Sequence, residues 1–273
     1  MCRHLAYLGP PKSLRELLIE PPHSLYRQSW EPKRQRSGVV NADGFGVGWF
    51  AEGDPEPVRY RQDGPIWADP SFPDIARAVR SRTVLAAVRD ATAGAAAGIE
   101  AAAPYAGAGW LFSHNGAIDG YPRSMAKLAE TIPALDLLQV EARTDSAFIW
   151  ALIQTRVREM GLEAGLETVP GAGPETGPET AAAVVAPADA MASAVASVVA
   201  DITAVTGARL NLLLTDGAMI VASVYGDSFS ALTGDGRTVV ASEPYDDSPG
   251  WTDVLEGVHT WSVAGLEGTV QAR

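Results

Sequence analysis

The chain has 273 residues, 47% of them hydrophobic, which is enough to bury a sizeable core in one large domain or two small ones. Its 33 acidic residues outnumber 21 basic ones, and a net charge of -12 disfavours nucleic acid and anionic membranes as partners. The start lacks the features of a secretory signal, and no apolar run reaches the ~20 residues that span a bilayer, so we expect a cytoplasmic protein without a transmembrane segment.

The chain begins with a pattern typical of a short strand. Residues 2–9 alternate loosely between apolar and polar, and Gly9-Pro10-Pro11 should end the strand, which puts Cys2 at its start. Because Cys2 is the only cysteine, the sequence excludes an intramolecular disulfide and a structural zinc site of several thiolates. The four histidines lack zinc-hydrolase spacings, so we expect no metal.

The first half of the chain predicts an antiparallel sheet with short helices. Ser13 is a plausible cap for a helix that ends before Pro21, residues 44–50 and 58–61 should form paired strands, and a helix over 73–81 leads into a buried strand over 84–89. Residues 110–113 form another buried strand, which we expect to turn at Asn115-Gly116.

The second half predicts two helices followed by strands. A helix begins at Thr144-Asp145 and shows one apolar face, and a second helix covers residues 188–205. Between them, residues 163–187 are rich in Gly, Pro, Ala, Glu and Thr, so we expect a loop insertion and not a domain boundary. Strands over 210–214, 219–224 and 238–242 complete an α+β layered sandwich.

Cys2 could carry out covalent catalysis if an aminopeptidase removes Met1. The residue would then offer a thiol and a free α-amine, whose reference pKa of ~7.7 to 8.0 suits a base near neutral pH. One residue would supply both nucleophile and base, an arrangement known for N-terminal threonine. The alternative is an ordinary cysteine near an exposed terminus.

Five motifs in order resemble the class II glutamine amidotransferases, a family of N-terminal nucleophile hydrolases. They are Met1-Cys2-Arg3, the run from Asn41 to Trp49, Arg89-Asp90-Ala91-Thr92, Ser113-His114-Asn115-Gly116 and Arg143-Thr144-Asp145-Ser146. Five matches in order are far more specific than any one of them. The resemblance implies a four-layer αββα sandwich of two antiparallel sheets and a single domain over residues 1–273.

The resemblance also implies roles for the matched residues. Asn115 and Gly116 would stabilise the oxyanion of a tetrahedral intermediate, because such an intermediate needs donors aimed at its oxygen. Arg89 and Thr92 would bind the α-carboxylate of a γ-glutamyl group and Asp145 its α-ammonium, since this head group carries both charges. In isolation, Asn115-Gly116 could be a simple hairpin turn, Arg89 could pair with Asp90, and Asp145 could serve its helix N-terminus.

Within this family, the opening Met1 to Gly9, the turn Asn41 to Gly44 and Ala241-Ser242-Glu243-Pro244 are most similar to the amidohydrolases of ergothioneine biosynthesis. These enzymes cleave γ-glutamyl-hercynylcysteine S-oxide. The resemblance implies hydrolysis through a γ-glutamyl thioester without metal or organic cofactor. Two alternatives stay open, a glutaminase subunit that supplies ammonia to a separate synthase, and a non-catalytic module that retains Met1.

The sequence leaves the leaving-group side of the substrate and the oligomeric state open. We expect His114 and His4 to support structure and not to act as bases. The suspected leaving group carries a trimethylammonium, which aromatic faces and acidic groups attract. The candidates for binding it are Trp30, Trp49, Trp67, Trp110, Tyr245, Asp246 and Asp247.

Overall fold

A computed structural model describes residues 2–36, 38, 40–54, 56–91, 97–163 and 187–271. Its strands form two antiparallel sheets. Sheet A has the order β11-β9-β10-β1-β4-β2-β3, with β1 Arg3–Ser13, β2 Phe45–Phe50, β3 Pro57–Gln62, β4 Arg80–Val88, β9 Ser230–Gly234, β10 Arg237–Ala241 and β11 Thr252–Asp253. Sheet B has the order β13-β12-β8-β7-β6-β5, with β5 Tyr105–Gly107, β6 Trp110–Ile118, β7 Ala208–Thr215, β8 Ile220–Val224, β12 Gly257–Ser262 and β13 Gly265–Val270.

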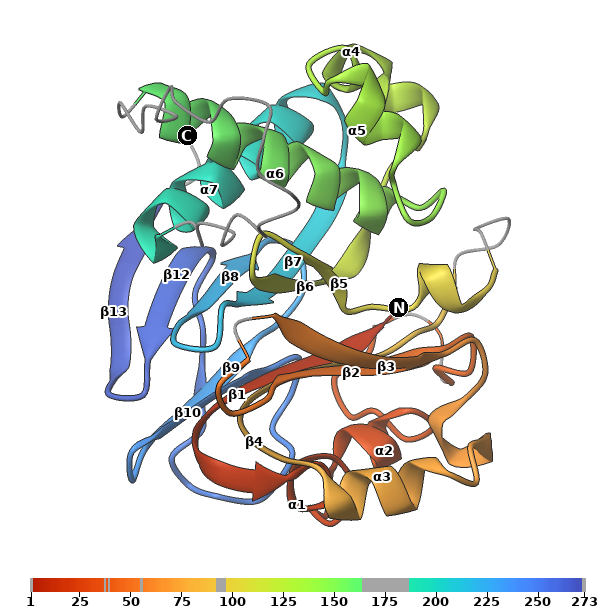
Figure 1. Cartoon of the computed structure of the whole chain (residues 1–273), viewed down its shortest axis with the longest axis vertical. Coiled ribbons are helices and arrows are strands. Elements are labelled where there is room, and N and C mark those ends of the chain that lie inside the picture. Colours follow the sequence, from red (N-terminus) through yellow and green to blue (C-terminus); the bar gives the residue numbers. More distant parts are fainter. Residues whose placement is uncertain are drawn as a thin grey trace, which may run out of the picture.

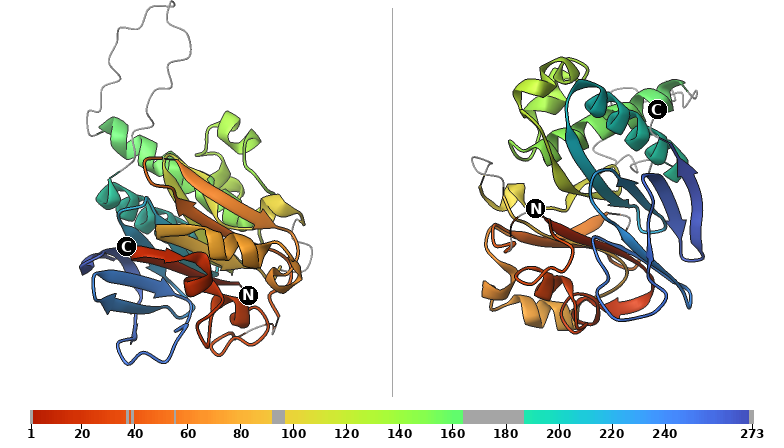
Figure 2. Two further views of the ribbon diagram at one scale, coloured as in Figure 1. Left: turned by 60° about the horizontal axis from the view of Figure 1, so that its bottom comes forward. Right: turned by 180° about the vertical axis from the view of Figure 1, so that it is seen from behind.

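The helices cover the outer faces of the two sheets, which pack against each other (Figure 1). Helices α1 (Leu14–Leu18), α2 (Leu25–Gln28) and α3 (Phe72–Ala78) contact β1 or β4 of sheet A. Helices α6 (Asp145–Glu163) and α7 (Ala188–Val205) contact sheet B. The same layering is seen from behind in Figure 2. The predicted αββα sandwich is therefore confirmed. Shorter elements are η1 Ile66–Ala68, η2 Ile99–Ala101, η3 Arg123–Met125, α4 Ala126–Ala129 and α5 Ala134–Leu138.

The first strand lies inside sheet A, between β4 and β10. It is longer than the sequence indicates, because it continues through Pro10 and Pro11 to Ser13, with a register shift between Leu8 and Lys12. A bulge of this kind lets a strand accommodate prolines, which cannot donate to the ladder. Ser13 then begins α1 with a capping box, in which its Oγ accepts from the Glu16 N–H at 3.2 Å.

The expected turn at Asn115-Gly116 is wrong. Strand β6 continues through both residues to Ile118, and Asn115 pairs with Asn211 on β7. The chain reverses after β6, where Gly120 has φ +70. An Asn-Gly pair forms a tight hairpin only when both residues adopt positive φ, and here the β7 partner keeps them extended.

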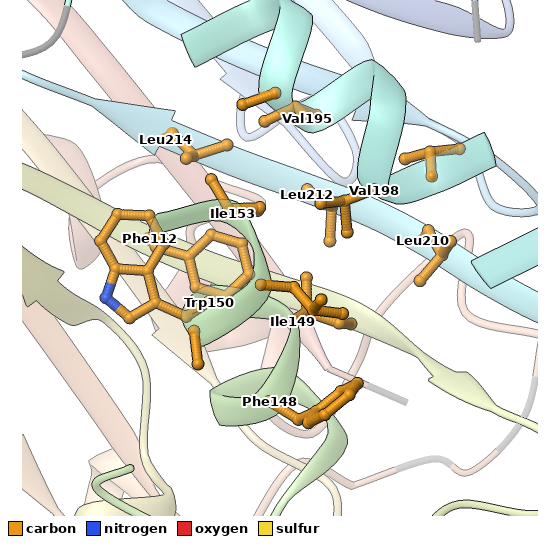
Figure 3. Packing of buried hydrophobic residues seen from close by; sticks show 14 of the residues in the cluster. Phe112, Phe148, Ile149, Trp150, Ile153, Val195, Val198, Leu210, Leu212 and Leu214 are labelled. Carbon is orange, nitrogen blue, oxygen red and sulfur yellow. The ribbon is translucent and has the colours of Figure 1, made fainter. Parts of the chain in front are cut away.

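The side chains of β6 alternate between two environments. Trp110, Phe112 and Ile118 join a core with α6 and α7, whereas Leu111 joins a core between the sheets. In the first core, Phe112 stacks on Trp150 of α6 at a centroid distance of 5.2 Å (Figure 3). Sheet A has its own core against α1, α2 and α3, built around Leu5, Phe45 and Phe72.

Helix α7 is long and apolar enough to cross a membrane by length and composition, with a mean hydropathy of 1.5. In the fold it is a core helix, because Val195, Val198 and Ile202 are fully buried against α6 and sheet B (Figure 3). Apart from its end residues Glu163 and Pro187, the predicted insertion over 163–187 lies outside the described residues.

Candidate active site

A cavity of about 810 Å³ opens where β1 begins, β4 ends and α6 starts. It draws residues from segments far apart in the chain, including Cys2, Arg89, Gly116 and Asp145. Four of the six predicted site residues thus line one space. Among the residues that the structure describes, the lining consists of Cys2, Arg89, Asp90, Ala91, Ala101, His114, Gly116, Ala117, Ile118, Asp119, Gly120, Tyr121, Pro122, Leu137, Leu138, Val140, Ala142, Arg143, Thr144, Asp145, Ser146 and Phe148.

Cys2 lies directly before β1, and its half-buried side chain has its Sγ 4.0 Å from the Asp90 carbonyl oxygen. Burial raises the pKa of the Cys2 thiol above its usual value, while Arg89 lowers it and Asp145 raises it. The two charged residues predicted to bind the glutamyl head group, Arg89 and Asp145, therefore also act on the thiol. Because burial dominates, the thiol needs a base to ionise near neutral pH. The expected removal of Met1 lies outside the described residues.

Arg89 follows the last residue of β4, and the turn through Asp43 holds it. The Arg89 Nη1 donates to the Asp43 carbonyl oxygen at 3.2 Å, while the Asp43 carboxylate accepts from the Ala91 N–H at 2.8 Å. Backbone bonds join Asp43 N to Arg89 O at 2.9 Å and Arg89 N to Gly44 O at 2.8 Å. This turn explains why the Asn41 to Gly44 motif accompanies the arginine. Thr92, the other predicted carboxylate ligand, lies outside the described residues.

Asp145 is the first residue of α6 and joins that helix to β6. Its Oδ2 accepts from the Ile118 N–H at 3.2 Å, and its Oδ1 accepts from the Ser146 N–H at 2.8 Å. A carboxylate in the first helical turn is stabilised by the helix dipole. Asp145 thus serves its helix while its side chain remains part of the cavity wall.

Asn115 is fully buried, and it is absent from the cavity lining. Its side chain shares a face of β6 with Ser113, whose Oγ lies 3.0 Å from the His4 Nδ1. Cys2 precedes His4 by two residues, and Asn115 follows Ser113 by two residues. Neither the Nδ2 nor the Oδ1 of Asn115 has a hydrogen-bond partner within the described part of the chain.

The two nearby histidines make contacts within the fold. His4 is buried, stacks on Phe229 at 4.9 Å, and has its pKa lowered well below the usual value by burial. His114 bridges Ser146 Oγ and the Arg209 carbonyl oxygen, each at 3.0 Å. Both rings therefore connect elements of the fold around the site.

The expected leaving-group residues do not line the cavity. Within the described part of the chain, the phenol of Tyr121 and the phenyl ring of Phe148 line it instead, with their centroids 5.9 Å apart. Sequence reasoning missed them, and also Asp119, Arg143 and the apolar wall formed by Leu137, Leu138 and Val140. The only sequence signal for these residues was that they lie near the Asn115-Gly116 and Thr144-Asp145 motifs along the chain. In the described ranges no group of three or more His, Cys, Asp or Glu could hold a metal ion.

The family model for class II glutamine amidotransferases matches residues 23–160, which include Arg89, Gly116 and Asp145. The chain belongs to this family.

Its relatives narrow the class further. The chain is 40% identical over 256 residues to the γ-glutamyl-hercynylcysteine sulfoxide hydrolase of Mycolicibacterium smegmatis, covering 93% of this chain and 92% of the relative. It is 35% identical over 254 residues to the Mycobacterium tuberculosis protein of the same name, covering 93% and 89%. A glutamine aminotransferase class-II domain protein of Silicibacter pomeroyi shares the fold with a TM-score of 0.62 and 23% identity over the whole of both chains.

Proposed function

We propose that this protein hydrolyses the γ-glutamyl amide bond of γ-glutamyl-hercynylcysteine sulfoxide, with Cys2 as the nucleophile. The observation that carries the proposal is the shared cavity, which places the only cysteine of the chain beside an arginine and an aspartate. The substrate named for the two mycobacterial relatives agrees with this chemistry. The reaction releases glutamate and the amine of the conjugate.

The glutamyl head group has two charges that the cavity can match. Arg89 would receive the α-carboxylate, because a guanidinium fork binds a carboxylate with two parallel hydrogen bonds. Asp145 would receive the α-ammonium. Thr92 would add a hydrogen bond to the carboxylate, as the family motif implies. Because Arg89 and Asp145 each hold backbone contacts, they offer a fixed separation between the two charges.

Catalysis would proceed through a thioester in two steps. The Cys2 sulfur attacks the γ-carbonyl carbon, and the Asn115 Nδ2 and Gly116 N–H stabilise the negative oxygen. The C–N bond breaks, and the α-amine of Cys2, free once Met1 is removed, passes the thiol proton to the departing nitrogen. Water then attacks the thioester, and the same amine accepts its proton. Cleavage of the C–S bond frees glutamate and restores the thiol.

The size of the cavity favours a conjugate over glutamine. A volume of about 810 Å³ lies in the range of pockets that enclose drug-sized ligands, roughly 300 to 1,000 Å³, so a glutamyl group fills only part of it. Arg143 and Asp119 add opposite charges beyond those assigned to the head group. The conjugate supplies partners for them, since the carboxylate of its cysteine and its trimethylammonium remain after the glutamyl group is placed.

The test compares turnover of γ-glutamyl-cysteinyl conjugates and of glutamine by the purified protein. We expect glutamate release from the conjugate to exceed release from glutamine by at least an order of magnitude, and loss of both in Cys2→Ala. Comparable rates on the two substrates would favour the glutaminase alternative. Substantial turnover by Cys2→Ala would contradict the mechanism, and Met1 retained in protein made in cells would favour the non-catalytic module.

Two further expectations accompany this function. The single-domain organisation over residues 1–273 agrees with the fact that each sheet takes strands from both halves of the chain. The cytoplasm would supply a reducing environment that keeps the Cys2 thiol free.

A further inference from the structure

The main chain of Cys2 is held by a buried arginine. The Arg3 Nε donates to the Cys2 carbonyl oxygen at 2.7 Å, and the Arg3 Nη1 lies 3.7 Å from the Glu243 Oε2. Arg3 and Glu243 are each only 1% exposed. Because desolvation offsets the attraction of a buried ion pair, such a pair gives little net stability. Its location next to Cys2 therefore suggests another use.

Glu243 is fixed by the segment that follows α2. Its Oε1 accepts from the Lys33 N–H at 2.9 Å, and its Oε2 accepts from the Arg34 N–H at 2.6 Å. The basic side chains of residues 33–36 favour a solvated loop, yet the main chain of Lys33 and Arg34 is bound to a buried carboxylate. Two backbone donors and one guanidinium thus hold the Glu243 carboxylate in a single orientation.

The ladder between β1 and β10 ends before it reaches Cys2. It runs from the Leu8–Thr238 pair to the Leu5–Ala241 pair. Beyond it, Ser242 donates its N–H to the His4 carbonyl oxygen at 2.9 Å, and the Ser242 Oγ accepts from the His4 N–H at 3.1 Å. Ser242 and Glu243 therefore continue the contacts with residues 3 and 4 after regular pairing stops.

We propose that Arg3 and Glu243 are positioning residues for the Cys2 nucleophile. Glu243 orients the guanidinium of Arg3, and Arg3 fixes the Cys2 carbonyl, so that the thiol is presented to the cavity in one position. Successive side chains of a strand point to opposite faces, so Arg3 acts from behind the nucleophile. Neither Arg3 nor Glu243 lines the cavity.

This inference rests on the proposed function, because it takes Cys2 as the reacting group. A displacement of about 1 Å at a reacting atom can reduce a rate about 100-fold. The positioning role therefore predicts a loss in kcat with little change in KM, since the residues that would bind the glutamyl head group are untouched.

The decisive variant is the double substitution Arg3→Met with Glu243→Gln. Each single substitution removes one half of a buried ion pair and should lower Tm. The double variant leaves neither charge, so its Tm should recover toward that of the original protein. We expect its kcat to remain at least tenfold reduced, because the Cys2 carbonyl has lost its donor. Recovery of both Tm and kcat would overturn the proposal.

A matched control is the double substitution Arg156→Met with Asp201→Asn. This pair joins α6 to α7 at 3.0 Å, and neither residue lines the cavity. It should leave kcat unchanged. Asp227, which also acts on the charge of Arg3, lies 3.2 Å from Arg209 and is unaltered in every variant.

A second measurement does not depend on substrate. Because Cys2 is the only cysteine, its alkylation by iodoacetamide reports on this thiol alone. In the double variant Arg3→Met with Glu243→Gln, we expect the pH profile of alkylation to shift to higher pH, since the charge of Arg3, which interacts with that of Cys2, no longer favours the thiolate. An unchanged profile would overturn the positioning role. Failure of the original protein to hydrolyse any γ-glutamyl compound would instead reject the proposed function.

Discussion

Asn115 lies directly opposite Asn211 in the pairing of β6 with β7, and only one of these two buried amides has hydrogen-bond partners in the described part of the chain. The Asn211 Nδ2 donates to the Asp227 carbonyl oxygen at 2.9 Å, and its Oδ1 accepts from the N–H groups of Tyr225 and Asp227 at 3.2 and 3.1 Å. Since Asn211 is committed to this turn, Asn115 keeps its donor available for an oxyanion. A buried donor with no competing partner is suited to a charge that develops only during reaction.

Replacing Asn115 with alanine should reduce kcat about 100- to 1,000-fold, which corresponds to about 2.7 to 4 kcal/mol of transition-state stabilisation. KM should change little, because the ground-state carbonyl needs no such donor. Steady-state kinetics on a γ-glutamyl conjugate measure both constants. A loss in kcat of less than tenfold would remove Asn115 from the oxyanion site. Tm should stay close to its original value, since the amide has no partners to lose within the described residues.

Replacing Asp145 with asparagine should lower kcat/KM for γ-glutamyl substrates about 30-fold, or about 2 kcal/mol, because a hydrogen bond to a charged group is lost. The matching glutaryl amide lacks the α-ammonium, so the same substitution should have little effect on it. Asp189→Asn, which removes the acidic residue in the first turn of α7 and lies outside the cavity lining, serves as the control. Equal losses on the two substrates would show that Asp145 acts only through the structure of α6.

Replacing Arg143 with glutamine should lower kcat/KM for a γ-glutamyl amino acid conjugate about fivefold, or about 1 kcal/mol, the value of an exposed ion pair. Glutamine turnover should be unchanged, because ammonia carries no carboxylate. The exposed Arg123, outside the cavity lining, provides the control Arg123→Gln. An equal effect of Arg143→Gln on both substrates would contradict a role on the leaving-group side.

Replacing Gly116 with alanine should destabilise the protein as well as abolish activity. A Cβ at this position would overlap the Arg209 carbonyl oxygen and approach the His114 Nε2 to 2.6 Å, so β6 and β7 would have to separate. Thermal unfolding should show a lower Tm, consistent with a cost of about 1 to 3 kcal/mol for overpacking. Gly64 has nothing within 4 Å of the same added atom, so Gly64→Ala should leave Tm nearly unchanged.

Stability should fall in mild acid partly because of His4. Burial, followed by the charge of Arg3, lowers the pKa of His4 well below its usual value. The unfolded chain takes up the proton below pH ~6.5 while the folded chain does not, so the stabilisation is complete above that pH and is lost as the pH falls toward the folded pKa.

His4→Gln should reduce this pH dependence. Urea unfolding at pH 7.5 and 5.5 measures it, and the original protein should lose up to about 1.4 kcal/mol per pH unit more than the variant. Equal losses would mean that His4 is protonated in the folded protein.

The sequence predicted the layers of the fold well, because long apolar runs and helix caps determine them locally. Helix α7 was predicted with its observed bounds, and α1 begins at the predicted Ser13 cap. The predicted path of the chain at Pro10-Pro11 and Asn115-Gly116 was wrong, because pairing with neighbouring strands overrode the local preferences of both residue pairs.

The residues of the candidate site also fall into those that the sequence predicted and those that it did not. Cys2, Arg89, Gly116 and Asp145 were predicted to share a site because they lie in motifs that resemble those of one family, and the structure has all four in the lining of one cavity. Tyr121, Phe148 and Arg143 could not be predicted as cavity residues, because nothing in their own segments shows which side of each segment meets the cavity. The buried contact of Arg3 with Glu243 depends on a pairing of residues 240 positions apart, and no local pattern encodes such a separation.

The position of β1 between β4 and β10 means that sheet A cannot be completed until residues 237–241 have been made. Strand β1 can pair with β4 once both have left the ribosome, but the edge that β10 will occupy is then still unpaired. That edge stays unpaired until residues 237–243 emerge. The same segment brings the Glu243 carboxylate to Arg3. A nascent chain that stops earlier would expose this unpaired strand edge to other chains, which favours aggregation.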